Sequence, residues 1–261
     1  MTALVAAVGQ TGARQLSVIG GLARFTLRVL RAASRLTRAG RAVTLRVLVN
    51  QIRFTALQAI GLVALLAFLL SFLIMAQSAA QLGRFGALNR IGTIMVVAVI
   101  RELGPLLTAM IVVSRSGTAI AAEMATNRVM GEVTALEAMG IDPYTYLVLP
   151  RLLGAIVSVA CLMVVFDIVA LASGFIGASY IADMTIGTYS RIVLGTLSAK
   201  DIWITVAKGI TFGGAVALFC SYQGLAVTAG PTEIPQAVTR GVVGTIVAIF
   251  VMSAVFVVLT A

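Results

Sequence analysis

Four charged residues lie inside long apolar runs, and they are the residues of this chain with the most obvious chemical potential. Arg101 and Glu102 are adjacent, while Asp167 and Lys208 lie far along the chain. Charged side chains in a membrane segment face the bundle interior or a wet cavity. A cation there could attract a lipid phosphate, and a carboxylate could carry a proton. The pattern is equally consistent with ion pairing inside the bundle and with a polar belt that binds substrate.

Other reactive groups are sparse. The sequence has no histidine, which excludes histidine-based catalysis and histidine metal sites. Its two cysteines, Cys161 and Cys220, are far apart in apolar runs and are expected to be small buried hydrophobic residues. No phosphate-binding GxxxxGK[ST] loop occurs. We therefore expect a non-enzymatic chain without cofactor or metal, in which any ATP hydrolysis belongs to another subunit.

Composition places these residues in a membrane. Hydrophobic residues make up 60% of the 261 positions and charged residues only 11%, against about 45–50% and about 25% in soluble domains. Five runs reach the length of about 20 residues that a membrane-spanning helix needs. They predict an all-α polytopic membrane protein with spans at about 54–76, 91–113, 152–179, 202–226 and 241–260.

The basic residues predict the orientation of these spans. With a cytoplasmic N-terminus, 13 of the 19 Lys and Arg residues fall in cytoplasmic segments. Four fall on the other side, namely Arg84, Arg90, Arg191 and Lys200. This bias predicts a cytoplasmic N-terminus and an outward C-terminus. A sixth span through the N-terminal segment would bury several arginines at about 2.5–3.5 kcal/mol each, so we do not expect one.

The N-terminal segment, residues 1–53, carries nine arginines and no acidic residue. Five of the arginines recur at steps of three and four, which places them within about 80° on one helix face. They are Arg24, Arg28, Arg31, Arg35 and Arg38. The spacing predicts an amphipathic helix in the headgroup plane, and a basic tail that only sets topology is the alternative. Neither a nucleic-acid-binding motif nor a signal-peptide pattern is present.

The segment 114–151, between the second and third runs, is the most polar part of the remaining chain. Its composition predicts a helix over about 118–140, which Gly140 would end before a turn at Asp142-Pro143. Such a helix could fit a groove on a soluble partner and transmit its motion to the spans. An ordinary interhelical loop is equally consistent with the composition.

Several motifs in and before this segment resemble the MlaE/YrbE permeases, the membrane subunits of lipid-transporting ABC systems. The resemblance covers about residues 50–260 and is most specific over 101–151. The matching stretches are Arg101-Glu102-Leu103-Gly104-Pro105, Arg115-x-Gly117, Ala119-Ile120-Ala121-Ala122-Glu123, Ala135-Leu136-Glu137-Ala138-Met139-Gly140-Ile141-Asp142-Pro143 and Tyr146-Leu147-Val148-Leu149-Pro150-Arg151.

The resemblance implies a phospholipid-moving permease in the bacterial inner membrane, with an N-terminal interfacial helix and five spans. Its partners would be a second permease copy, a cytoplasmic ABC ATPase dimer that holds ATP and Mg²⁺, and a membrane-anchored Mce-domain carrier on the outer face. The helix between the second and third spans would be the coupling helix that docks on the ATPase. Candidate coupling residues in this segment are Glu123, Arg128, Glu132, Glu137, Met139 and Asp142.

Within the spans, the resemblance favours a transport role for Glu102 and Lys208, with Arg101 beside them. Gly104 and Pro105 form a possible bend. The chain departs from the family pattern at Gly131 and Thr134, where the family commonly has acidic residues. It also lacks an aspartate near the end of the last span, at 255–260.

One alternative function and one possible dimer contact stay open from the residues alone. An ion-coupled secondary transporter could use Glu102 or Asp167 as a proton site. Gly209 and Gly213 form a GxxxG pattern in the fourth run, which weakly suggests a dimer face.

Overall fold

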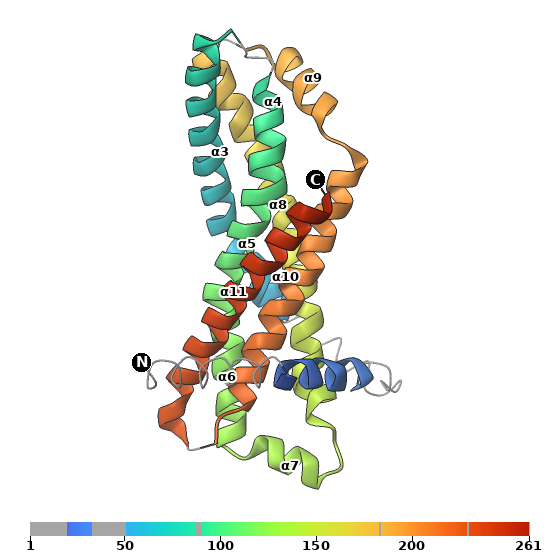
Figure 1. Cartoon of the computed structure of the whole chain (residues 1–261). Helices are drawn as coiled ribbons and strands as arrows, with labels where there is room; N and C mark the ends of the chain where they lie inside the picture. Colours follow the sequence, from blue (N-terminus) through green and yellow to red (C-terminus); the bar gives the residue numbers. More distant parts are fainter. Residues whose placement is uncertain (1–19, 33–50, 87–89, 183, 229, 261) are drawn as a thin grey trace, which may run out of the picture.

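A computed structural model of the chain describes residues 20–32, 51–86, 90–182, 184–228 and 230–260, and this part contains helices and no strands. Five of its helices are long and apolar enough to cross a membrane, which confirms the predicted all-α polytopic fold (Figure 1). They run over Thr55–Arg84, Ile91–Val129, Tyr144–Ile181, Ala199–Leu225 and Pro231–Thr260.

Several long helices consist of consecutive segments. The first is η1 (Arg53–Leu57) followed by α3 (Gln58–Arg84). The second comprises α4 (Ile91–Ile94), the π-helical η3 (Met95–Leu103), α5 (Gly104–Val112), η4 (Val113–Gly117) and α6 (Thr118–Val129). The short α7 (Glu132–Ala138) precedes η5 (Tyr144–Val148) and α8 (Leu149–Ala182). After α9 (Ile186–Thr196) come α10 (Ala199–Leu225), η6 (Pro231–Glu233) and α11 (Ile234–Thr260).

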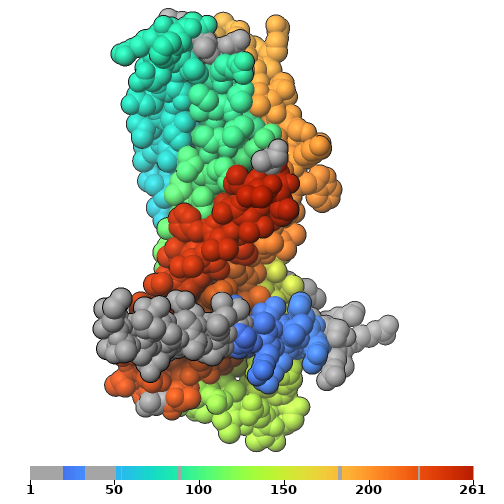
Figure 2. All heavy atoms as spheres, viewed as in Figure 1, coloured from blue at the N-terminus to red at the C-terminus, as the bar shows by residue number. Residues whose placement is uncertain are grey.

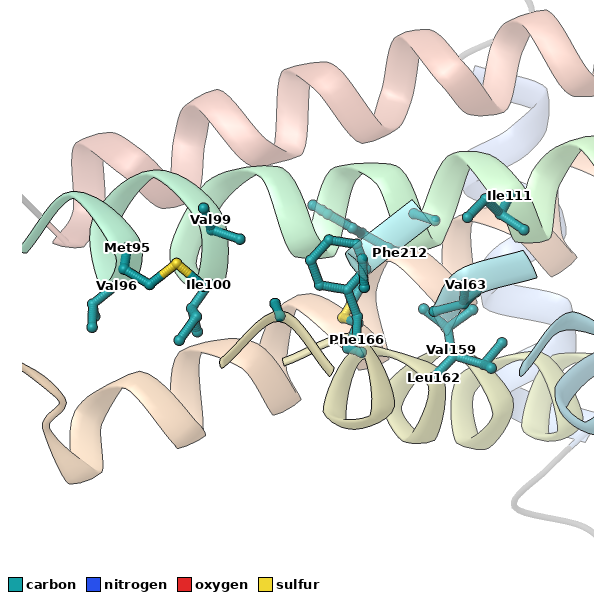
Figure 3. Close-up of a cluster of buried hydrophobic side chains, with 14 of the residues drawn as sticks. Val63, Met95, Val96, Val99, Ile100, Ile111, Val159, Leu162, Phe166 and Phe212 are labelled. Atoms are coloured by element: carbon teal, nitrogen blue, oxygen red, sulfur yellow. The ribbon is translucent and has the colours of Figure 1, made fainter. Parts of the chain in front are cut away.

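Small residues allow the spans to pack closely. On α3 a buried residue recurs every fourth position, which gives one narrow face directed at α8. Ser71 on this face donates a hydrogen bond to the Ala170 carbonyl at 2.6 Å. Figure 3 shows Phe166 of α8 and Phe212 of α10 within the main core. Gly104 leaves room for the Phe166 ring, which would lie 2.9 Å from an added Cβ.

The GxxxG pattern of the fourth span serves packing within the chain. A Cβ at Gly209 would lie 2.8 Å from Ala160 Cα, and one at Gly213 would lie 2.7 Å from Ile156 Cα. Both contacts are with α8 of the same chain, so the suggested dimer face is wrong. The two glycines instead bring α8 and α10 together at the height of the main core.

Gly213 and its neighbour Gly214 offer a matched pair of substitutions. Gly213→Ala should lower stability by about 1–3 kcal/mol, because the added methyl meets the α8 backbone. Gly214→Ala should raise stability by up to about 1 kcal/mol, because open space surrounds that position and alanine favours a helix. Melting temperatures of the two purified variants in detergent test the opposite signs. Equal shifts would contradict the close contact between Gly213 and the α8 backbone.

The helix predicted over 118–140 is two helices in the structure. Residues 118–129 continue the second long helix, because buried residues of α6 such as Ile120, Ala121 and Met124 pack against α10 and α11. The break follows at Gly131, whose φ of 78° is in the left-handed region that glycine favours. Only the seven residues of α7 lie across the end of the bundle (Figure 1). Residues 114–129 are polar in composition, but one side of this stretch is still buried in the bundle.

A helix over residues 20–32 lies across the bundle near its lower end in Figure 1, roughly perpendicular to the spans. Arg24, Arg28 and Arg31 are exposed on it. Arg35 and Arg38 of the predicted basic face lie outside the described residues. The two cysteines differ in environment, since Cys220 is buried as predicted and Cys161 is exposed on α8.

Candidate functional site

Two ion pairs link the second and fourth long helices inside the bundle. Lys208 Nζ lies 3.0 Å from Glu102 Oε1, and Arg101 Nε lies 2.7 Å from Asp201 Oδ1. We call Arg101, Glu102, Asp201 and Lys208 the charged cluster. Its formal charges cancel, so it can exist between apolar walls without a net charge.

Lys208 is the most buried member of the charged cluster, with 1% of its side chain exposed. Its ammonium donates to Glu102 Oε1 at 3.0 Å and to the Arg101 carbonyl at 2.5 Å. Pro105 explains this second acceptor. In a regular helix the residue 105 amide would bond the carbonyl four residues earlier, and proline has no amide hydrogen. Proline thus leaves the Arg101 carbonyl open to the lysine.

Arg101 and Asp201 form the outer half of the charged cluster. Asp201 is only 2% exposed and also accepts a hydrogen bond from the Ser198 amide at 2.8 Å, as part of the capping box that starts α10. Sequence reasoning missed Asp201 as a site residue. The Ser198-x-x-Asp201 spacing does signal a helix start, but its ion pair depends on how α10 packs against η3.

The two ion pairs lie at different depths. Asp201 and Lys208 are seven residues apart on α10, which is about 10 Å along a helix. About one third of the Arg101 and Glu102 side chains is exposed. Ser253 of α11 lies on the other side of Glu102, with its hydroxyl 3.4 Å from Oε2. A ligand could therefore reach a cation and a carboxylate without opening the buried part of the charged cluster.

Asp167 does not join the charged cluster. Its Oδ1 is buried and has no hydrogen-bond partner among the described residues. Asp201 instead supplies the second acidic group that pairs with the two cations. Within the described residues there is also no group of three His, Cys, Asp or Glu side chains that could hold a metal ion.

The candidate coupling residues fall into two groups. Glu123 binds Arg151 Nη2 at 2.6 Å and thereby ties α6 to the start of α8. Asp142 accepts hydrogen bonds from the Tyr144 amide at 3.2 Å and from Thr145 Oγ1 at 2.7 Å. Asp142 therefore holds the turn after α7, while Glu123 joins the two helices α6 and α8 that flank this segment.

The remaining candidates lie at the surface around α7. Glu132 and Glu137 are exposed, as is Met139 together with Met130 before the helix. Arg128 lines a polar cavity of about 300 Å³ together with Val129, Thr134, Val227, Thr228 and Gly230. The inner face of α7 is fixed, because buried Val133 packs in one cluster with Ile120 and Leu147. The outer face combines exposed methionines with acidic groups.

Comparison with known proteins finds a family match and several related sequences. The model of the family "Permease MlaE" matches residues 48–259. A probable ABC transporter permease protein of Rickettsia prowazekii is 32% identical over 207 residues, which cover 79% of this chain and 80% of the relative. A probable ABC transporter permease protein of Synechocystis is 30% identical over 67% of this chain and 66% of its own.

A plant relative is more distant. The chloroplastic protein TRIGALACTOSYLDIACYLGLYCEROL 1 of Arabidopsis thaliana is 26% identical over 206 residues, covering 77% of this chain and 58% of the relative. The family match spans four of the five long helices completely and almost all of the fifth. This chain therefore belongs to the MlaE permease family of ABC transporter membrane subunits.

Proposed function

We propose that this permease moves phospholipid, or a similar amphiphile, between the bacterial inner membrane and an Mce-type carrier, driven by a separate ATPase. One observation carries the proposal. The helix Ile91–Val129 bears Arg101 and Glu102 in its first third and ends directly before α7. Force applied to α7 by an ATPase would therefore act on the same helix that carries half of the charged cluster.

The chemistry of the charged cluster suits an amphiphile. A phosphate could bind the partly exposed Arg101 guanidinium in place of one Asp201 contact. Acyl chains would meet the apolar walls of neighbouring spans. The name of the Arabidopsis relative contains a diacylglycerol lipid, which supports a lipid as the class of substrate.

The proposed assembly has two permease copies, an ATPase dimer and a membrane-anchored Mce-domain protein. Large apolar residues exposed on α3 and α11 provide surface for lipid and for a second copy. They include Leu62, Leu65, Leu69 and Leu73 on α3, and Val243, Val247, Phe250 and Val251 on α11. The arginine bias supports an orientation in which the N-terminus and α7 lie in the cytoplasm and the C-terminus lies in the periplasm.

Reconstitution tests the proposal. The permease and its ATPase, placed together in vesicles, should transfer fluorescent phospholipid to an added carrier only while ATP is hydrolysed. An ATPase variant that binds but does not hydrolyse ATP should reduce transfer to the level of protein-free vesicles. Undiminished transfer with that variant would refute ATP coupling. If a proton gradient alone then drove transfer, the secondary transporter with Glu102 or Asp167 as its proton site would be favoured.

A further inference from the structure

The helix over residues 20–32, here called the basic helix, is held on the bundle by aromatic contacts. Phe25 packs edge-on against Tyr144, with ring centroids 5.5 Å apart, and against Tyr222, with centroids 5.6 Å apart. Phe25 and Val29 are buried in one cluster with residues of η5, α8 and α10. Gly21 allows the close approach, because an added Cβ there would collide with the Tyr222 hydroxyl.

The contacts with Tyr144 place the basic helix against the start of the third span. We call this segment, residues Tyr144–Val148, the elbow. Tyr144 is the first residue of η5, which follows α7 after a short turn. Arg28 Nη1 lies 3.2 Å from the Tyr144 hydroxyl, to which it donates, and its guanidinium carbon lies 6.0 Å from the ring centroid. A displacement of α7 that is passed through the turn to Tyr144 would therefore either move the basic helix or break these contacts.

The rest of the basic helix is exposed on two further sides. At about 100° per residue, the three arginines fall within about 60° of each other. The exposed leucines are centred about 100° away from the arginines around the helix axis. The arginines are Arg24, Arg28 and Arg31, and the leucines are Leu27 and Leu30, which are 53% and 56% exposed. Figure 2 shows this helix at the molecular surface, level with the lower ends of the spans.

We propose that the basic helix binds anionic phospholipid headgroups of the surrounding membrane and, when bound, holds the Tyr144–Val148 elbow in place. The proposal rests on the proposed function only in taking α7 as the input of force. It adds a form of regulation by lipid composition. A membrane with more anionic lipid would hold the elbow more firmly during transport.

A membrane surface is the partner that fits both exposed sides. Arginines beside leucines on one helix are suited to headgroups above the edge of the acyl layer. The surplus of charge extends along residues 1–53, which contain nine arginines and no acid. An acidic protein partner would match the arginines and would leave Leu27 and Leu30 in water. The basic helix also lies across the bundle near the lower ends of the apolar spans in Figure 1, where the surface of a lipid bilayer would be the adjacent medium.

Hydrogen–deuterium exchange of the full chain in lipid nanodiscs tests the proposal without using transport. Discs of phosphatidylcholine are compared with discs that also contain phosphatidylglycerol. We expect amide exchange in 20–32 and in 144–148 to slow by about five- to tenfold in the anionic discs. Equal exchange in both kinds of disc would overturn the proposal. Soluble glycerol phosphate should have no such effect, and protection by it would indicate a phosphate site in place of a membrane surface.

Two variants separate lipid binding by the basic helix from the effect of this helix on the elbow. R24Q/R31Q keeps the Arg28–Tyr144 contact and should lose most of the lipid response in both segments. Its matched control is R84Q/R191Q, two exposed arginines at the opposite end, which should respond as the unmodified chain does. Phe25→Ala should keep lipid-dependent protection of 20–32 and lose it in 144–148. A full elbow response in Phe25→Ala would refute the holding role, whether or not the protein transports lipid.

Discussion

Lys208→Met should lower the stability of the permease by about 3 kcal/mol and abolish lipid transfer. The substitution leaves Glu102 without its cation, and removal of one partner from a buried ion pair typically costs about 3–5 kcal/mol. We expect the low end of this range because about one third of the Glu102 side chain is exposed. The melting temperature in detergent should fall by about 10 °C.

The double variant E102L/K208M distinguishes a structural ion pair from a functional one. It removes both charges and should recover most of the lost stability, since apolar replacements of buried ion pairs are often neutral. Transfer should nevertheless stay absent, because only the outer half of the charged cluster, Arg101 and Asp201, is then left to meet a headgroup. Recovery of both properties would show that the pair only stabilises the fold. Lys200→Met, at the exposed start of the same helix, is the control and should change neither property.

The helices were largely predictable because hydrophobic length is a local property. All five long helices overlap the five predicted apolar runs, and the structure extends most of them beyond the predicted ends. The extensions contain polar residues, such as Arg84 and Tyr144, that an apolar window excludes. A helix continues through such residues because its own backbone hydrogen bonds persist outside the apolar layer.

The pairing of the charged cluster was less predictable. A charged residue in an apolar run is visible in the sequence, and Arg101, Glu102 and Lys208 do come together. Which acid joins them depends on the packing of α10 against the second helix, a non-local property. Asp201 is therefore in the cluster and Asp167, inside a longer apolar run, is not. Gly131 similarly marks the start of α7 only once its positive φ is known.

M130S/M139S should weaken binding of the ATPase to the permease by roughly 100-fold. These methionines flank α7, and 73% and 65% of their respective surfaces is exposed. Burial of such a side chain in a groove contributes about 1.5–3 kcal/mol, and each 1.4 kcal/mol is a factor of ten in affinity. The stability of the permease should not change, because neither residue belongs to the core around Val133. Titration of the ATPase against detergent-solubilised permease measures the effect.

The matched control for this surface lies at the opposite end of the molecule. I186S/L194S removes two apolar side chains of α9 that are 66% and 70% exposed (Figure 1). It should leave ATPase affinity unchanged. ATP-dependent lipid transfer by M130S/M139S should recover at saturating ATPase, because the charged cluster and the helix Ile91–Val129 remain intact. If the α9 variant lost the ATPase and the α7 variant kept it, α7 would not be the coupling helix, and the orientation of the chain in the membrane would have to be reversed.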